Sequence, residues 1–389
     1  MNDQEINSQE LLEESNRDER DDIKIPKDLR AVIAYTRDWT VDTIVRQLED
    51  KNILLDPKFQ RRNAWNDQKR SALIESLIWG APIPQIILAE LPDQPRKYVV
   101  IDGKQRLLAI WGYIDPSLEY WEKPHLKDLR VLDELTGKSF KEINASNSAN
   151  EIGHRLLNAD VRCTILSNYK SEDVLAEIFY RINTGSVLLG AQELRQVLKR
   201  GWFADYLVEI TNSPQPLHEI LGLEGPDVRL NDIEIILRAL SIKNFGKDYR
   251  GNLKDFLDES MSRFAKSLTK EEAAREYEWF NDGIEKLKLV FKPSDIGRKR
   301  KNGEFEKRFN RSLFEAVHFL ISQLPTAVIS QHTKELQDAF NFSLETNVEL
   351  INSIESTTKS MERTKTRYRE LAKTIKDATQ FSTRHPFEV

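Results

Sequence analysis

The feature that most constrains the fold is a change in hydrophobic periodicity near residue 190. Up to about Asn183, short apolar runs with strand-like alternation are interspersed with segments of helical period. Beyond Ala191 nearly every apolar pattern recurs at three and four residues, as in AQELRQVLKRGWFADYLVEI and LNDIEIILRALSI. We therefore predict an α+β chain, in which an α/β domain is followed by an all-helical C-terminal domain.

Local signals predict the elements of the first part. Thr40 and Asn66 are suited to cap helices in TVDTIVRQLEDK and DQKRSALIESLIW, and Gly80 is suited to end the second helix. Further helices are predicted from Lys104 and over SEDVLAEIFYRIN. Strands are predicted in NILLDP, PQIILAEL and KYVVID and at Val161–Leu166.

The N-terminal segment differs in composition from the rest of the chain. Residues 1–22 carry nine acidic and two basic side chains, whereas the whole chain has a net charge of -5, so the remainder is mildly basic. Few large apolar groups occur there, which is typical of disorder. We predict an acidic, disordered tail and lead-in over 1–37, an α/β domain over 38–190 and a helical domain over 191–389.

Several classes of protein are disfavoured by the sequence. No apolar run approaches the ~20 residues of a membrane helix, and the N-terminus lacks the apolar segment of a signal peptide. The single cysteine, Cys163, excludes an internal disulfide framework and lies in a strand-like segment, where we expect a buried thiol. These features predict a cytoplasmic protein without a membrane partner, and the mildly basic body permits contact with nucleic acid or nucleotide.

The segment YVVIDGKQRLL places a glycine turn between a predicted strand and a predicted helix. Gly103 allows the backbone to approach a ligand closely, and the N-terminus of the following helix favours an anion. Arg106 can grip phosphate oxygens with two N–H groups, and Lys104 adds a mobile charge. Gln105 can orient water, while Asp102 can hold a metal ion or accept a proton. The structural alternative is an ion pair between Asp102 and Arg106 on one helix face, and the residues alone leave both interpretations open.

Two other loops contain candidate ligand-binding residues. The first loop contains Gln60, Arg61 and Arg62 and lies just before a predicted helix. The nearby tryptophan indicates a shaped site. The alternative is a solvated surface, which is usual for two adjacent arginines in a loop. Asn183 and Gly185 belong to a small polar loop that can cradle a phosphate or a base edge. The alternative for this loop is an ordinary helix C-terminus, in which glycine supplies the left-handed residue.

Three stretches follow one another in an order that is similar to a known family. They are FQR…W…K…LIESL…G.PIP.I, then IDGKQRL, then F.RIN.G…L..QELR. In this order they resemble the GmrSD-type restriction-endonuclease N-terminal family, which is marked by an Asp-Gly-Gln-Gln-Arg signature on a ParB/sulfiredoxin-like fold. The resemblance runs from about Thr40 to Arg238, and Lys104 replaces the first glutamine of the signature.

The resemblance implies a ParB/sulfiredoxin-like fold and a nucleotide-linked activity in defence against modified or foreign DNA. We therefore predict a nucleotide-binding, NTP-hydrolysing module of a prokaryotic DNA-defence system. It places an NTP where the Gly103 turn meets the loops of Arg61 and Asn183, with Mg²⁺ beside the phosphates. Under this interpretation Arg106 and Arg61 contact phosphates. The remaining expected roles are metal or water binding for Asp102, water orientation for Gln105, and nucleotide binding for Gln60, Arg62, Lys104 and Gly185.

Two other functions stay open from the sequence. The same turn is proposed to cleave DNA in ParB-like nucleases, and a non-catalytic form of the domain can bind DNA or a protein as a regulator. Many relatives carry a C-terminal HNH nuclease, but the six histidines of this chain form no ligand cluster in the sequence. The expected partners are therefore NTP, DNA and a separate nuclease or methyltransferase.

Two basic stretches lie in the second part, GRKRKNGEFEKRFNRSLFEAV and KSMERTKTRYRELAKTIK. We interpret both as helical. Each is either a solvated helix face or a contact to DNA phosphates.

Overall fold

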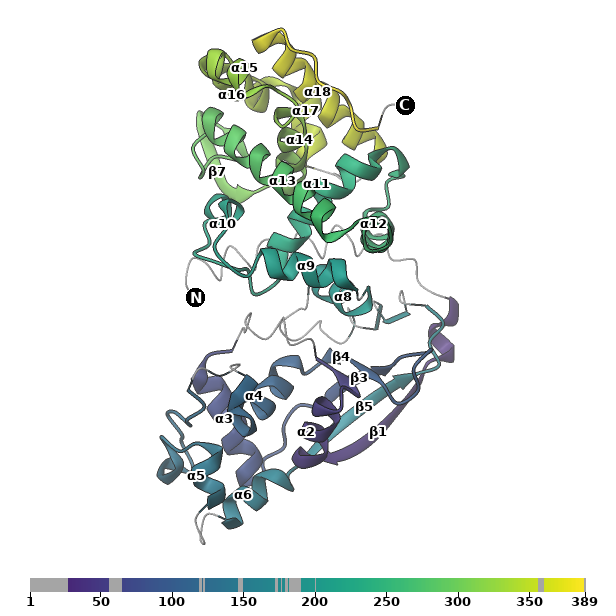
Figure 1. The fold of residues 1–389 in the computed structure, drawn as a ribbon, viewed down its shortest axis with the longest axis vertical. Coiled ribbons are helices and arrows are strands. Elements are labelled where there is room, and N and C mark those ends of the chain that lie inside the picture. The colour runs from purple at the N-terminus through teal and green to yellow at the C-terminus, as the bar shows by residue number, and fades with distance from the viewer. Residues whose placement is uncertain are drawn as a thin grey trace. The chain divides into compact units, whose positions relative to one another are not determined.

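The computed structural model describes residues 27–55, 65–118, 121, 123–145, 150–171, 174–175, 177–178, 181, 190–199, 201–355 and 360–387. The chain forms two compact units, one of residues 24–188 and one that includes residues 189–389, and Figure 1 labels most of their helices and strands. The predicted α+β class is confirmed, because a mixed five-stranded sheet is followed by a largely helical region. The domain boundaries drawn from the sequence remain a prediction.

The sheet of the first unit has the strand order β1-β5-β3-β4-β2. The pairs β1/β5 and β3/β4 are antiparallel, whereas β5/β3 and β4/β2 are parallel. This mixture arises because the connections between the strands include both a hairpin and helical crossovers. The strands are β1 (Ile33–Thr40), β2 (Ile53–Leu54), β3 (Ile86–Glu90), β4 (Tyr98–Asp102) and β5 (Asp160–Ser167).

Capping residues position the helices of this unit as the sequence predicts. The Thr40 side chain accepts a hydrogen bond from the Thr43 N–H, and the Asn66 side chain accepts one from Lys69. Gly80 ends its helix in the left-handed region at φ 84°. The helices are α2 (Val41–Glu49), α3 (Asp67–Trp79), α4 (Lys104–Ile114), α5 (Phe140–Ala145) and α6 (Asn150–Leu157), with short 3-10 turns at Lys27–Ala31, Pro116–Leu118 and Asp133–Leu135. The helix predicted over 171–183 lies mostly outside the described residues.

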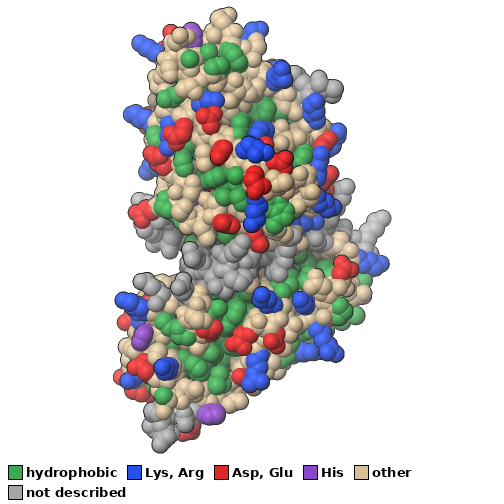
Figure 2. Space-filling model, viewed as in Figure 1, with side chains coloured by type: hydrophobic (Ala, Val, Ile, Leu, Met, Phe, Trp, Pro, Cys, Tyr) green, Lys and Arg blue, Asp and Glu red, His purple; other side chains and the backbone are tan. Residues whose placement is uncertain are grey.

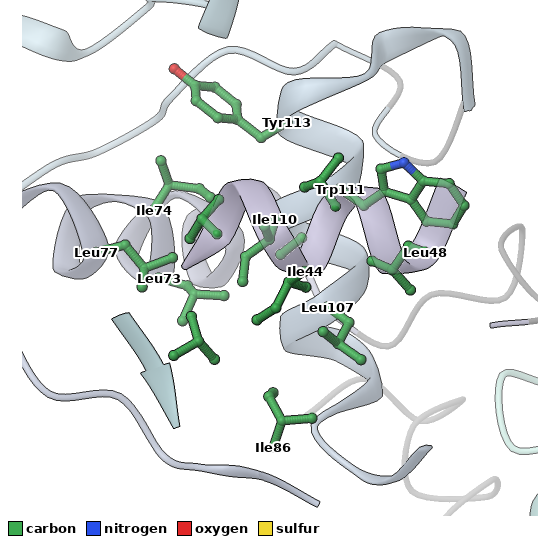
Figure 3. Packing of buried hydrophobic residues seen from close by; sticks show 14 of the residues in the cluster. Ile44, Leu48, Leu73, Ile74, Leu77, Ile86, Leu107, Ile110, Trp111 and Tyr113 are labelled. Atoms are coloured by element: carbon green, nitrogen blue, oxygen red, sulfur yellow. The ribbon is translucent and has the colours of Figure 1, made fainter. Parts of the chain in front are cut away.

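The core of the first unit lies between one face of the sheet and these helices. Figure 3 shows side chains of α2, α3 and α4 gathered in one cluster, with Ile86 of β3 at its edge. The apolar residues that the helical periodicity selects are indeed buried, including Ile44 at 0% exposure and Leu77 at 3%. The sheet face that contributes Cys163 and Ile165 therefore forms the base of this core.

The sequence analysis did not predict the first strand. β1 begins at Ile33 and pairs with β5 along its whole length, from Ile33↔Ser167 to Thr40↔Asp160. The sheet thus includes residues that the sequence analysis assigned to the lead-in before residue 38. Most side chains of β1, an edge strand, are exposed, so its sequence lacks the apolar alternation by which strands are recognised.

The second unit is built mainly from helices around α11, which is buried from Asn231 to Ile242. Helix α11 packs against α12, α13 and α14, and α18 packs against α14, α16 and α17. The helices are α8 (Ala191–Leu198), α9 (Trp202–Ile210), α10 (Pro216–Leu221), α11 (Asn231–Phe245), α12 (Leu253–Ser267), α13 (Lys270–Val290), α14 (Arg311–Ile321), α15 (Thr326–Gln331), α16 (Thr333–Thr346), α17 (Val348–Glu355) and α18 (Met361–Thr379), with a 3-10 turn at Gly246–Asp248.

One segment of this unit is not helical, and the expectation of a basic helix there was wrong. Strands β6 (Arg298–Lys301) and β7 (Glu304–Phe309) form an antiparallel hairpin. Its turn residues Asn302 and Gly303 both have positive φ, at 53° and 85°. Asn-Gly is the preferred pair for such a two-residue turn, so the turn chemistry overrides the basic, helix-compatible composition. In the described parts of the chain no helix is both long enough and apolar enough to span a bilayer.

Candidate functional site

The glycine turn joins β4 to α4 as the sequence predicts. Gly103 caps α4 in the left-handed region, at φ 95° and ψ 11°, and offers the helix no side-chain cap. A Cβ at this position would lie 2.4 Å from Cδ1 and 3.3 Å from Cα of Ile86, and 3.2 Å from Nη2 of Arg106. Glycine is therefore required here both by the backbone conformation and by the close approach of β3.

Arg106 links the end of β4 to the start of β3. Its Nη2 donates to Oδ2 of Asp102 at 2.8 Å and to the carbonyl oxygen of Gln85 at 3.1 Å. The Arg106 side chain is 13% exposed and that of Asp102 is 29% exposed, so the pair lies at the surface of the sheet but is largely covered. Nε of Arg106 is buried without a hydrogen-bond partner. The ion pair between Asp102 and Arg106 is therefore present, as one of the two interpretations of this turn predicted. The Arg106 guanidinium nevertheless keeps N–H donors that this pair does not use.

The pairing of β3 with β4 contains an irregularity beside Asp102. Ile87 pairs with Asp102 on β4, and Leu88 pairs with Val100, so the register shifts by one residue between them. Ile87 also pairs with Thr164 of β5. Directly paired residues point to the same face of a sheet, so Asp102 and Thr164 flank Ile87 on one face. Bulges of this kind are frequent beside functional sites, where they re-aim a side chain.

Two polar residues of this face were missed by the sequence analysis. Thr164 donates its hydroxyl to Oε1 of Gln85 at 2.8 Å, while the Gln85 carbonyl holds Arg106. Thr164 faces away from the core, because its neighbours Cys163 and Ile165 belong to the core cluster. Gln85 lies inside the first of the three ordered motifs, and this position was the only feature of the sequence that pointed to it. No feature of the sequence pointed to Thr164.

The predicted site residues fall into two groups. Asp102, Gly103, Lys104, Gln105 and Arg106 lie together at the end of β4 and in the first turn of α4, where Lys104 and Gln105 are half-buried. The five residues of the other two loops lie outside the described residues, so their predicted approach to this turn stays a prediction: Gln60, Arg61, Arg62, Asn183 and Gly185.

The QELR part of the third motif has a structural role. Arg195 donates to Asp258 at 2.7 Å and to Oε1 of Gln192 at 2.7 Å, and all three residues are largely buried. Burial alone would raise the pKa of Asp258, but the charges of Arg195 and Lys254 outweigh it and lower that pKa. This motif thus joins α8 to α12 within the second unit.

Much of the charge in the two basic stretches is already used by the fold. Arg300 pairs with Glu345 at 3.2 Å, and Arg369 pairs with Glu349 at 2.8 Å. Arg367 is 1% exposed. On the face shown in Figure 2, Lys and Arg side chains are interspersed with Asp and Glu rather than gathered in one patch. Fewer cations than the sequence suggests are therefore available to DNA phosphates.

Cys163 is fully buried in β5, as predicted, and burial raises the pKa of its thiol to about 12. Among the described residues, no three His, Cys, Asp or Glu side chains converge as a metal-binding group.

Comparison with known proteins gives one match. Residues 42–198 match the family described as GmrSD restriction endonuclease, N-terminal domain. The match covers all described parts of the glycine turn and of the sheet except β1. No curated protein and no solved structure matches the chain.

Proposed function

Residues 42–198 belong to the N-terminal domain family of GmrSD restriction endonucleases, and on this premise we propose that the protein is a nucleotide-binding, NTP-hydrolysing module of a prokaryotic DNA-defence system. The observation that carries the proposal is the glycine turn at Asp102–Arg106. A left-handed glycine, a helix N-terminus and an arginine with unused donors are the parts that commonly hold a phosphate.

Arg106 is the main phosphate ligand in this proposal. Its Nη2 is fixed by Asp102 and by the Gln85 carbonyl, which orients the plane of the guanidinium before any ligand arrives. Among the described residues Nη1 has no acceptor, so this nitrogen is available to a phosphate oxygen. Such pre-orientation reduces the side-chain entropy that binding would otherwise cost.

Asp102 is the proposed metal or water ligand. Its Oδ2 accepts the bond from Arg106, and Oδ1 remains outside that bond. Mg²⁺ that arrives with an NTP commonly takes one or two protein carboxylates and completes its shell with phosphate oxygens and water, so a single carboxylate fits. When bound, the ion would neutralise phosphate charge. Gln105, in the same helical turn, is the proposed residue that orients water.

The remaining roles rest on the family resemblance. Arg61 is the proposed second phosphate contact, with Gln60, Arg62, Lys104, Asn183 and Gly185 as further nucleotide contacts. DNA and a separate nuclease or methyltransferase are the proposed partners, because a restriction system must both recognise and cut DNA. The proposed location is the cytoplasm.

The test measures phosphate release from each NTP with Mg²⁺, with and without plasmid DNA, and thermal shifts under the same conditions. We expect phosphate release by the wild type and its loss in Arg106→Ala and Arg106→Lys, because an ammonium cannot replace the planar guanidinium. Arg162→Ala is the matched control, since Arg162 forms an exposed ion pair with Asp38 on the same sheet.

The other functions appear as distinct outcomes of this test. DNA nicking without phosphate release would support the nuclease alternative. A third outcome would refute the proposal and favour a non-catalytic regulator. In that outcome the protein neither releases phosphate nor nicks DNA, and Arg106→Ala leaves the NTP thermal shift unchanged.

A further inference from the structure

Arg106 is held partly by a residue that lies at the end of a strand. One of its two acceptors is the backbone carbonyl of Gln85, 3.1 Å from Nη2. Gln85 directly precedes β3, which begins at Ile86. Strand ends open more readily than strand centres, so a side-chain contact can decide where such a residue lies. The contacts of the Gln85 side chain therefore bear on the position of the Arg106 guanidinium.

The side chain of Gln85 is attached to the neighbouring strand. Thr164 of β5 donates its hydroxyl to Oε1 of Gln85 at 2.8 Å. Thr164 pairs with Ile87, two residues after Gln85, so this threonine lies beside the start of β3. Two hydrogen bonds thus link β5 to the guanidinium of Arg106, with Gln85 between them.

The groups at the end of this link are closely packed. A Cβ on Gly103 would lie 3.3 Å from Cα of Ile86 and 3.2 Å from Nη2 of Arg106. The start of β3, the glycine turn and the guanidinium are therefore near neighbours, and the Arg106 side chain is only 13% exposed. Closely packed groups transmit small displacements, so a shift of Gln85 should reach Arg106.

We propose that Thr164 is a positioning residue for Arg106 and acts through Gln85. Its hydroxyl holds the Gln85 side chain and so helps to place the carbonyl that orients the plane of the guanidinium. Arg106 then meets a phosphate with its side chain already ordered, which lowers the entropy cost of binding. The phosphate in this proposal rests on the proposed function, whereas the link from Thr164 to Arg106 does not.

The alternative is that strand pairing alone places Gln85. Gln85 is exposed, so water can replace the Thr164 hydroxyl, and the hydrogen bond would then have no effect on Arg106. Thr36 offers a matched control for this alternative. It pairs directly with Thr164 across β1 and β5 and is exposed, and among the described residues its hydroxyl makes no hydrogen bond. Thr36→Val thus makes the same chemical change without breaking the link.

The first test measures ligand binding by the full chain. The probes are the non-hydrolysable β,γ-methylene analogues of ATP, CTP, GTP and UTP with Mg²⁺, titrated in a calorimeter. We expect Thr164→Val to raise the dissociation constant about three- to tenfold, the range for ordering one side chain. Thr164→Ser keeps the hydroxyl and should restore the wild-type value, and Thr36→Val should not change it. An unchanged dissociation constant in Thr164→Val would overturn the proposal.

A double-mutant cycle tests the link without any ligand. The free energy of unfolding in urea is measured for the wild type, Thr164→Val, Arg106→Ala and the double variant. Because both residues share Gln85 as a partner, the double variant should lose less than the sum of the single losses. The same cycle with Thr36→Val in place of Thr164→Val should be additive. Additive losses in the Thr164 cycle would overturn the proposal. Coupled losses in a protein that binds none of the analogues would support the positioning role and count against the proposed function, so the two can fail separately.

Discussion

Replacing Gly103 by alanine tests whether the close approach of β3 shapes the candidate site. Two costs add at this position. An alanine at φ 95° is strained by about 1–2 kcal/mol. Its Cβ would also lie 2.4 Å from Cδ1 of Ile86, which is 0% exposed, so overpacking adds about 1–3 kcal/mol. We expect a total loss of about 2–5 kcal/mol.

Gly80→Ala separates the two costs. Gly80 has a similar backbone angle, φ 84°, but a Cβ there would meet no atom within 4 Å. This variant should lose only the conformational part, about 1–2 kcal/mol. A double variant, Gly103→Ala with Ile86→Val, removes the Cδ1 atom and should regain part of the steric cost.

Urea unfolding of the wild type and these variants, followed by circular dichroism, measures the differences at constant m-value. The thermal shift caused by NTP and Mg²⁺ should also fall in Gly103→Ala and persist in Gly80→Ala. If Gly103→Ala is no more destabilising than Gly80→Ala, the steric argument is wrong and only the backbone angle requires glycine.

Four further outcomes are expected. Arg106→Ala should cost about 1–2 kcal/mol in urea unfolding, more than an exposed ion pair, because the side chains of Arg106 and Asp102 are largely covered. A cost near zero would contradict this. Burial lowers the pKa of His318 to about 4 in the folded protein, from 6.5 in the unfolded chain. Between these two values the unfolded chain binds a proton that the folded protein does not bind. The free energy of unfolding should therefore fall by about 3 kcal/mol as the pH drops from 6.5 to 4. His318→Gln should flatten that pH profile, and an unchanged slope would exclude His318 as its source. Deleting residues 1–22 should leave the melting temperature unchanged, because they lack apolar anchors. If the basic stretches contact DNA, log affinity should fall with log salt by about one unit per phosphate contact, whereas salt-independent binding would assign them to solvent.

The sequence by itself determined the elements whose signals are local. Thr40 and Asn66 cap helices through bonds to residues three positions away, and Gly80 ends α3 within the same turn. The order of Asp102, Gly103 and the helix after them likewise follows from short-range geometry. Because such contacts involve neighbours in the chain, residue type and spacing were sufficient to place β4, the turn and α4.

Features that depend on distant partners were decided only by the tertiary structure. β1 becomes a strand because it pairs with β5, far along the chain, and its own exposed side chains carry little pattern. Gln85 and Thr164 join the site only because β3 lies between β4 and β5. The pairings of β5 with β1 and with β3 join segments that are far apart in the chain. Local sequence does not reveal them, because the order of the strands depends on how the buried faces of the whole unit pack together.

The fate of the charged residues shows the same limit. Arg300 and Arg298 are two residues apart in a run that resembles a solvated basic surface. In the fold, Arg300 of β6 pairs with Glu345 of α16, whereas Arg298 is buried and forms no ion pair among the described residues. Composition fixes how many charges a chain carries, but burial and the partner across the fold decide which are neutralised and which remain able to bind a ligand.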